Sequence, residues 1–119
     1  MKKTNLFFII FTLIFFSVFS QKPQNDQISI TGKIIDSNTK EPLEYATVIL
    51  NNQETKQLSG GITDENGNFN IKINTGTYDI SFEFISFKTI KISNKIINSS
   101  INFGTIKLSE DADELDEIV

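Results

Sequence analysis

The sequence predicts an all-β fold: a seven-stranded antiparallel Greek-key β-sandwich that follows a cleaved N-terminal signal peptide. Apolar side chains alternate with polar ones in several short segments, which is the period of a half-buried strand. Clusters of Gly, Pro, Asn, Asp and Ser separate these segments at intervals of roughly 8–14 residues. No helical period appears after residue 20. This pattern is typical of two antiparallel sheets that pack face to face.

The start of the chain has the composition of a secretory signal. Lys2 and Lys3 precede an apolar stretch at residues 6–19, and the small Ser20 supplies a cleavage point before Gln21. At 1.5 Å per residue a helix of that stretch spans about 21 Å, less than the roughly 30 Å hydrocarbon core of a bilayer. We therefore expect residues 1–20 to be a cleaved signal peptide, with an uncleaved anchor as the alternative.

A polar linker at residues 21–27 precedes the first expected strands. Residues 28–35 alternate, and Gly32 takes an inward position where a neighbouring backbone can approach closely. A turn cluster that ends at Pro42 leads to a second strand at residues 45–50. Proline fixes the backbone of the turn before that strand.

The middle of the chain predicts a hairpin. After a polar loop at residues 51–59, a short strand at residues 60–63 is joined to a strand at residues 68–73. The connection is Asp64-Glu65-Asn66-Gly67, and Asn-Gly between alternating segments is a strong hairpin signal because both residues tolerate positive φ.

The second half contains the clearest alternation, at residues 78–84, followed by a short strand at residues 89–92. Residues 94–100 are expected to form a loop, and residues 101–108 the last strand. The inward set of that strand changes phase between Phe103 and Ile106, which predicts a β-bulge near Gly104. The expected core comprises Ile28, Ile30, Ile34, Ala46, Val48, Leu50, Phe69, Ile71, Ile73, Tyr78, Ile80, Phe82, Phe84, Ile90, Ile92, Ile101, Phe103, Ile106 and Leu108.

Charge is concentrated at the C-terminal end. Residues 21–108 hold nine lysines and nine acids, whereas residues 109–119 hold six acids and no base. A neutral domain without arginine is a poor nucleic-acid binder, because neutralising phosphates dominates that affinity. The chain has no cysteine and no histidine, so it forms neither a disulfide nor an ordinary zinc site, and no Ser-His or Cys-His pair. We expect no catalytic residue, metal or cofactor, and ordinary pKa values for the solvated acids of the domain.

Three weaker patterns each have a structural alternative. Asp64–Asn68 places oxygens at alternate positions as in a calcium loop, but glycine is at position 4 and Thr75 at position 12, so we favour a turn. Asn98-Ser99-Ser100 fits a glycosylation sequon, which is weak evidence in a loop. The aromatic residues could stack on a sugar, but their inward positions favour the core.

Four ordered blocks resemble a known family: residues 30–36, Ile-Thr-Gly-Lys-Ile-Ile-Asp; residues 41–48, Glu-Pro-Leu-Glu-Tyr-Ala-Thr-Val; residues 61–69, Gly-Ile-Thr-Asp-Glu-Asn-Gly-Asn-Phe; and residues 84–89, Phe-Ile-Ser-Phe-Lys-Thr. Residues 28–108 thereby resemble the carboxypeptidase regulatory-like domain, a transthyretin-like β-sandwich. In carboxypeptidases this domain is an accessory, so the resemblance implies no peptidase activity. The family usually has Pro-Gly-Ala at residues 44–46 and Gly-Tyr at residues 86–87, where this chain has Glu-Tyr-Ala and Ser-Phe.

The same resemblance implies a role in partner binding for the acidic tail, residues 109–119. The domain is common at the N-terminus of TonB-dependent outer-membrane receptors of the Bacteroidetes type, where an acidic segment leads to the TonB box. That box pairs with TonB as an added strand, and β-branched residues suit such pairing. The end of the chain is similar to the opening of the box and comprises Leu115, Asp116, Glu117, Ile118 and Val119. The alternative is an acidic terminus with an incidental Ile-Val pair.

The expected function is therefore that of a non-catalytic N-terminal accessory domain of a TonB-dependent receptor, present here as a fragment or truncated product. Its implied partners are TonB and the plug and barrel of the same receptor, and its implied location is the periplasm beside the outer membrane. The alternative is a free-standing exported β-sandwich that serves as an interaction or ligand-binding module.

Overall fold

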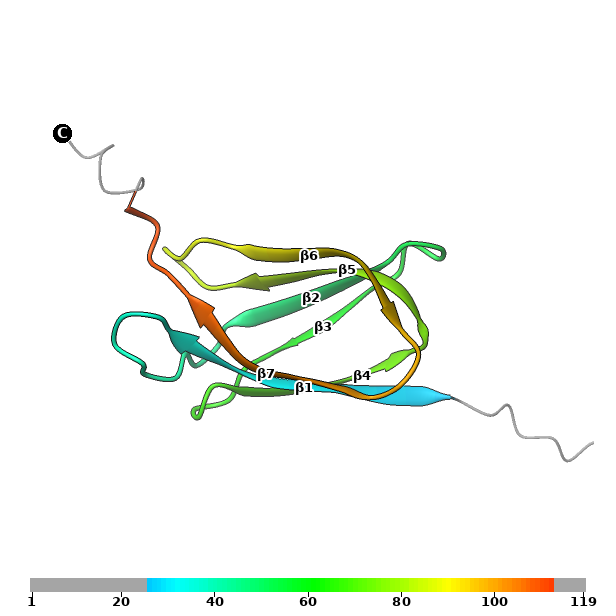
Figure 1. Ribbon diagram of the computed structural model, residues 1–119, viewed down its shortest axis with the longest axis horizontal. Coiled ribbons are helices and arrows are strands. Elements are labelled where there is room, and N and C mark those ends of the chain that lie inside the picture. The colour runs from blue at the N-terminus through cyan, green and yellow to red at the C-terminus, as the bar shows by residue number, and fades with distance from the viewer. Residues whose placement is uncertain (1–25, 113–119) are drawn as a thin grey trace, which may run out of the picture.

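The computed structural model describes residues 26–112, which form seven strands (Figure 1). The expectations of a signal peptide at residues 1–20 and of a TonB-box-like strand at residues 115–119 fall outside these residues. The strands are β1 (Gln27–Asp36), β2 (Thr47–Asn52), β3 (Leu58–Ile62), β4 (Asn68–Asn74), β5 (Gly76–Glu83), β6 (Ile90–Ile97) and β7 (Ile101–Leu108).

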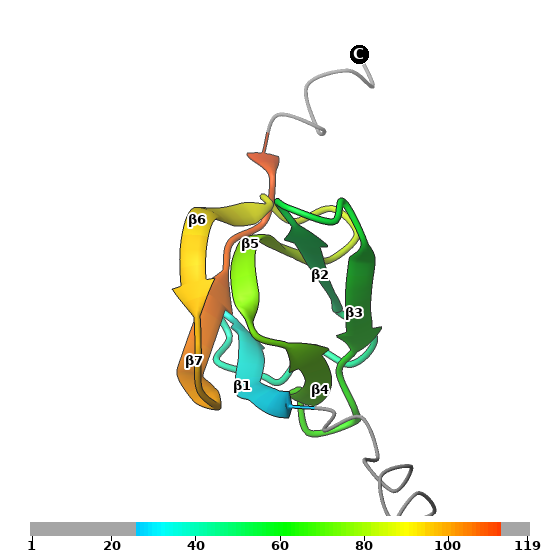
Figure 2. The ribbon, with the colours of Figure 1, turned by 90° about the vertical axis from the view of Figure 1, so that its right-hand side faces the viewer.

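Two sheets face each other, which confirms the predicted all-β sandwich (Figure 2). One sheet has the strand order β4-β1-β7 and the other has the order β3-β2-β5-β6. Four of the strand pairs are antiparallel as expected, but β1 and β7 are parallel. The connection from β6 delivers the chain to the end of the molecule where β1 begins, with the Ser29 N–H donating to Ser100 Oγ at 3.0 Å. The last strand must then run alongside β1 in the same direction.

The two ends of the described chain consequently lie far apart. The chain enters at the start of β1 and leaves at the end of β7, and Figure 1 shows these points at opposite ends of the sandwich. Within residues 26–112 no helix has the length and apolar character needed to cross a membrane.

The expected hairpin between residues 60–63 and 68–73 is wrong. β3 pairs with β2 in one sheet and β4 pairs with β1 in the other, so the turn at residues 64–67 carries the chain from sheet to sheet. Gly67 adopts a φ of 76°, whereas Asn66 is not among the residues with positive φ. The turn signal is therefore real, but a turn does not dictate that its flanking strands pair with each other.

The predicted core is largely confirmed. Phe69, Phe82 and Phe103 form its centre, with ring centroids of the two neighbouring pairs 6.0 and 5.9 Å apart. Ile28, Phe84, Ile90, Ile92, Ile101 and Ile106 are partly buried against it, as is Phe103 itself. The buried residues of the core cluster are Ile30, Ile34, Leu43, Ala46, Val48, Leu50, Phe69, Ile71, Ile73, Tyr78, Ile80, Phe82, Ile97 and Leu108.

The expected loop at residues 94–100 is wrong in its first half, because β6 continues to Ile97. The strand passes through an irregularity opposite Asp79, where Asn94 has a φ of 57°. The Asp79 carboxylate accepts hydrogen bonds from the Asn94 N–H at 3.0 Å and from Gln53 Nε2 at 2.9 Å. These bonds lower the pKa of Asp79 below its ordinary value, which corrects the expectation for this one acid. A bulge supported in this way lets Ile97 reach the core.

Candidate functional site

The candidate sites among the described residues are concave surfaces of the sandwich. Residues 26–112 contain no group of three or more acids, histidines or cysteines placed to hold a metal ion. The fold does provide two concave surfaces: a hollow on the outer face of the β4-β1-β7 sheet and a groove at the end of the sandwich where β7 leaves. We describe them in turn.

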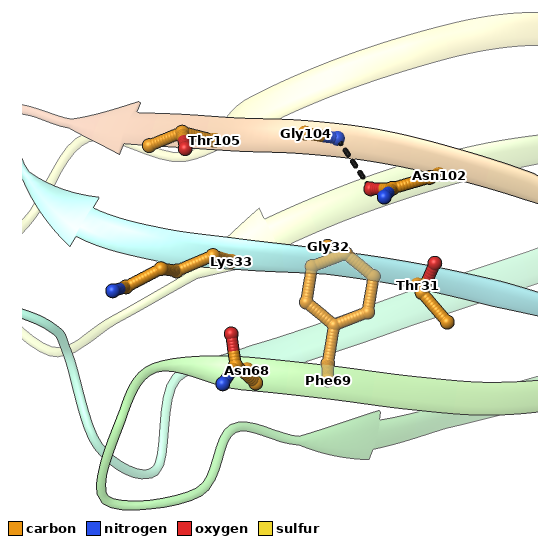
Figure 3. A pocket seen from close by; sticks show the side chains of 8 residues that line it. All are labelled: Thr31, Gly32, Lys33, Asn68, Phe69, Asn102, Gly104 and Thr105. Carbon is orange, nitrogen blue, oxygen red and sulfur yellow. Dashed lines mark hydrogen bonds between the residues drawn. The ribbon is translucent and has the colours of Figure 1, made fainter.

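The hollow, which we call the bulge hollow, has a volume of about 420 Å³. It forms beside two glycines: Gly104 adds no side chain to the outer face, and the inward side of Gly32 is filled by the ring of Phe69, which Figure 3 shows lying against it. A Cβ atom on Gly32 would lie only 2.5 Å from Phe69 Cζ. The close approach expected at Gly32 thus exists, and an aromatic side chain makes it. The lining residues are Thr31, Gly32, Lys33, Asn68, Phe69, Asn102, Gly104 and Thr105.

A β-bulge shapes this hollow, as predicted near Gly104. The β1–β7 register skips between Thr31 and Lys33, and Gly104 has a φ of 69°. Asn102 Oδ1 accepts a hydrogen bond from the Gly104 N–H at 2.8 Å, which holds the bulge (Figure 3). Lys33 contributes a cationic group, but the polar side chains around it are short and lie on an open face. One of them, Asn102, already accepts the hydrogen bond that holds the bulge.

The second surface, which we call the end groove, has a volume of about 680 Å³. Two exposed apolar side chains distinguish it: Tyr45 is 67% exposed and Ile85 is 83% exposed. Its charged lining consists of Glu44 and Glu83. The full lining is Glu44, Tyr45, Thr47, Glu83, Phe84, Ile85, Ser86, Phe87 and Thr89.

The loop that presents Tyr45 is fixed by Thr63, which is almost fully buried. Thr63 Oγ1 accepts a hydrogen bond from the Ala46 N–H at 2.9 Å and donates one to the Leu43 carbonyl at 2.5 Å. The Tyr45 N–H donates to the Thr63 carbonyl at 3.1 Å. The aromatic ring therefore stands in the groove because its backbone is held on both sides.

Two residues of the groove have left-handed backbones. Tyr45 has a φ of 62° and Ser86 a φ of 65°, conformations that cost a side-chain-bearing residue about 1–2 kcal/mol. Both fall where the resembling family usually has glycine, so the chain keeps the backbone shape while adding side chains. Tyr45 was expected to begin a strand, but β2 begins at Thr47. The departure from Pro-Gly-Ala was the sequence signal for this exposed ring.

The C-terminal segment is bonded to residues that line the groove or adjoin its lining. The Lys88 N–H donates to the Ser109 carbonyl at 2.8 Å, and the Asp111 N–H donates to the Ser86 carbonyl at 2.9 Å. Phe87 and Glu110 form a β-bridge between these bonds. The folded part therefore extends past the expected boundary at residue 108, and the chain leaves the domain at the rim of the end groove.

The predicted turn residues come together at the same end. Gly67 lies against Pro42, since a Cβ on Gly67 would be 3.0 Å from Pro42 Cβ, and Pro42 bridges Ile35. Asp64 Oδ1 accepts hydrogen bonds from the Asn66 and Asn68 N–H groups, each at 2.9 Å. This carboxylate thus stabilises the turn. Gly32 lies apart from them, in the bulge hollow.

Solved structures similar to this chain show the sandwich in varied settings. A chain of a type II cohesin–X-dockerin complex from Acetivibrio cellulolyticus is 23% identical, with a TM-score of 0.51 over 68% of this chain and 56% of that one. A putative carbohydrate binding protein from Bacteroides uniformis is 20% identical, with a TM-score of 0.51 over 68% and 40%. A 3-chlorocatechol 1,2-dioxygenase from Rhodococcus opacus is 8% identical, with a TM-score of 0.54 over 76% and 63%.

These likenesses concern the fold alone, and this chain spans less than two thirds of each of those chains. A comparison with curated proteins finds no match. The comparison with family models finds one over residues 30–119, described as CarboxypepD_reg-like domain. It includes all seven strands apart from the first residues of β1.

Proposed function

Because the chain belongs to the CarboxypepD_reg-like domain family, we propose that it is a non-catalytic accessory domain at the N-terminus of a TonB-dependent outer-membrane receptor. In this role the sandwich is exported to the periplasm, and residues 115–119 dock on TonB as an added strand. The receptor's own plug and barrel would supply transport.

The observation that carries the proposal is the path of the chain. It enters at one end of the sandwich and leaves at the other, and Ser109–Asp111 are fixed to residues 86–88 as they leave. The described chain therefore ends at the opposite end of the sandwich from the start of β1, as an in-line domain between two other segments would. The acids of the tail favour a solvated, extended segment, and Ile118-Val119 suits strand pairing.

The first test measures binding of the periplasmic part of TonB to residues 21–119 and to residues 21–112 by biolayer interferometry. We cut after Ala112 so that the paired segment Ser109–Asp111 stays intact. We expect the longer chain to bind and the shorter one to lose at least about tenfold in affinity, the loss expected when a strand-forming segment is removed. Equal binding by the two chains would refute the role of the tail.

A matched pair of variants separates strand pairing from charge. Ile118→Asn with Val119→Asn removes the β-branched pair and should reduce the affinity for TonB to that of residues 21–112. Asp113→Asn with Glu114→Gln removes two acids and should leave most of the affinity of residues 21–119. Reading the coding sequence beyond Val119 tests the context separately: an in-frame plug and barrel supports the receptor, and a stop codon followed by unrelated genes contradicts it.

A further inference from the structure

We propose that the end groove is a docking site for a protein segment that carries apolar and basic side chains. The inference does not depend on the receptor context, because it concerns a surface of the folded domain and not the tail. It rests on three properties of the groove: exposed apolar side chains on a fixed backbone, uncompensated acids, and its place beside the departing chain.

The apolar side chains are held in place at an energetic cost. Tyr45 has a left-handed backbone, and the residue is 67% exposed, so burial in the core does not offset that strain. Ile85 is 83% exposed and precedes the left-handed Ser86 in the chain. The residues on either side of these two, Phe84 and Phe87, form a T-shaped ring pair with centroids 5.3 Å apart. A rigid aromatic residue beside an exposed isoleucine is the kind of anchor that interfaces use.

The charges of the groove determine which partner fits. Glu44 and Glu83 line it, and neither forms an ion pair with any residue between 26 and 112. Glu110 lies beside it on the departing segment, where it forms a β-bridge with Phe87, and the backbone of Lys88 is bonded to Ser109 of the same segment. An acidic rim around apolar anchors attracts lysine or arginine next to apolar side chains.

The same charges argue against the chain's own tail as the occupant. Residues 113–119 contain Leu115, Ile118 and Val119, but they also contain four acids and no base. Placing them over Glu44 and Glu83 would bring like charges together, which is unfavourable. Anionic membranes are disfavoured for the same reason. The groove therefore fits a separate, basic and apolar segment.

The test uses residues 21–119, because the core residues of the described chain all lie between Ile28 and Leu108. The probe is a short fluorescein-labelled peptide of interspersed lysine and leucine with serine spacers, and two companions replace lysine by glutamate or leucine by serine. Fluorescence anisotropy should show binding of the first peptide only. In amide NMR spectra of the protein, the shifts that it causes should concentrate at residues 44–47 and 83–89.

Two groove variants should each weaken binding of the basic peptide by about tenfold or more, as truncation of interface anchors does. Tyr45→Gly with Ile85→Ser removes the anchors, and Glu44→Gln with Glu83→Gln removes the charges. The matched control is Leu58→Ser with Ile96→Ser, which removes two side chains that are 66% and 70% exposed elsewhere. This control should change the affinity by less than about twofold. Urea unfolding verifies that each variant is folded.

Several results would overturn the proposal. The glutamate peptide could bind as tightly as the lysine peptide, or the control variant could lose as much affinity as the groove variants. Deleting residues 113–119 could raise the affinity several-fold, which would make the tail the occupant. Sedimentation could show a dimer that Ile85→Ser dissociates, or flotation could show binding to neutral lipid vesicles that needs Tyr45 and Ile85.

Discussion

Replacing Gly32 by alanine should destabilise the domain, chiefly through a clash with the ring of Phe69. The new Cβ would lie 2.5 Å from Phe69 Cζ, 2.8 Å from Cε1, and 3.2 Å from the Gly104 carbonyl oxygen. Carbon atoms in contact are normally about 3.5–4.0 Å apart, so the ring would have to move by roughly 1 Å. Phe69 is buried and packs on Phe82, which limits that movement.

The magnitude follows from two opposing effects. Overpacking a core lowers the free energy of unfolding by about 1–3 kcal/mol. Alanine in place of glycine raises it by about 0.4–1 kcal/mol, because it reduces the conformational entropy of the unfolded chain. The net loss should be about 1–2 kcal/mol. Urea unfolding at neutral pH, followed by circular dichroism, measures it as a lower midpoint with an unchanged m-value.

A double-mutant cycle tests the cause. Phe69→Leu shortens the side chain that Gly32→Ala would meet, so the two changes together should cost less than the sum of the single changes, by about 1 kcal/mol. Gly104→Ala is the control, because a Cβ there has no neighbour within 4 Å and its cost comes from a φ of 69° alone. It should show no coupling to residue 69. Additive costs for Gly32→Ala and Phe69→Leu, or a Gly32→Ala variant as stable as the wild type, would refute the reasoning.

Three further predictions concern stability. Tyr45→Gly should leave the free energy of unfolding unchanged or raise it by up to about 1 kcal/mol, because it relieves a left-handed backbone; a loss in urea unfolding would show that the ring packs on the fold. Thr63→Val should lower it by about 2–3 kcal/mol, since the buried Ala46 N–H loses its acceptor, while Thr63→Ser should keep most of the stability. Asp79 has a lowered pKa in the fold, so its contribution is present above about pH 4 and is lost as the pH falls through the folded-state pKa. Asp79→Asn should flatten that part of a stability-against-pH curve from urea unfolding, and a curve parallel to that of the wild type would contradict the assignment.

Period-two alternation carried most of the fold prediction, because burial on one face of a strand is a local property. Ile30, Phe69, Ile80 and Phe82 were identified as inward-facing from their own neighbours in sequence, and all are buried. The bulge around Gly104 was predictable in the same way. Phe103 and Ile106 are three residues apart, and both can face the core only if the strand contains one extra residue between them.

Pairing between strands could not be read in the same way. The turn at residues 64–67 has the composition of a hairpin, yet β3 pairs with β2 and β4 pairs with β1, in different sheets. The residues of the turn carry no information about these distant partners. The parallel β1–β7 pair depends on where the connection after β6 ends, which is a property of the whole fold. The second half of β6 was missed because Asn94 interrupts the alternation, and the support that Asp79 gives it comes from another strand.

The end groove was missed for a related reason. Its side chains come from the loop before β2 and from the turn between β5 and β6, which are distant in sequence. Only the departures from the family pattern at Tyr45 and Ser86 signalled it, and the meaning of those departures depends on the left-handed backbone that the structure shows.

The parallel β1–β7 pair has a mechanical consequence. Tension applied between the N-terminal and C-terminal ends of the chain would act along these two strands in opposite directions, because the chain enters at one end of the pair and leaves at the other. The hydrogen bonds of the ladder would then be loaded in shear and share the force, instead of opening one after another as in a strand peeled from its edge. Resistance to such a pull depends on the rate of unfolding and not on the equilibrium stability. The order of the strands thus favours resistance to unfolding when the two ends of the domain are pulled apart.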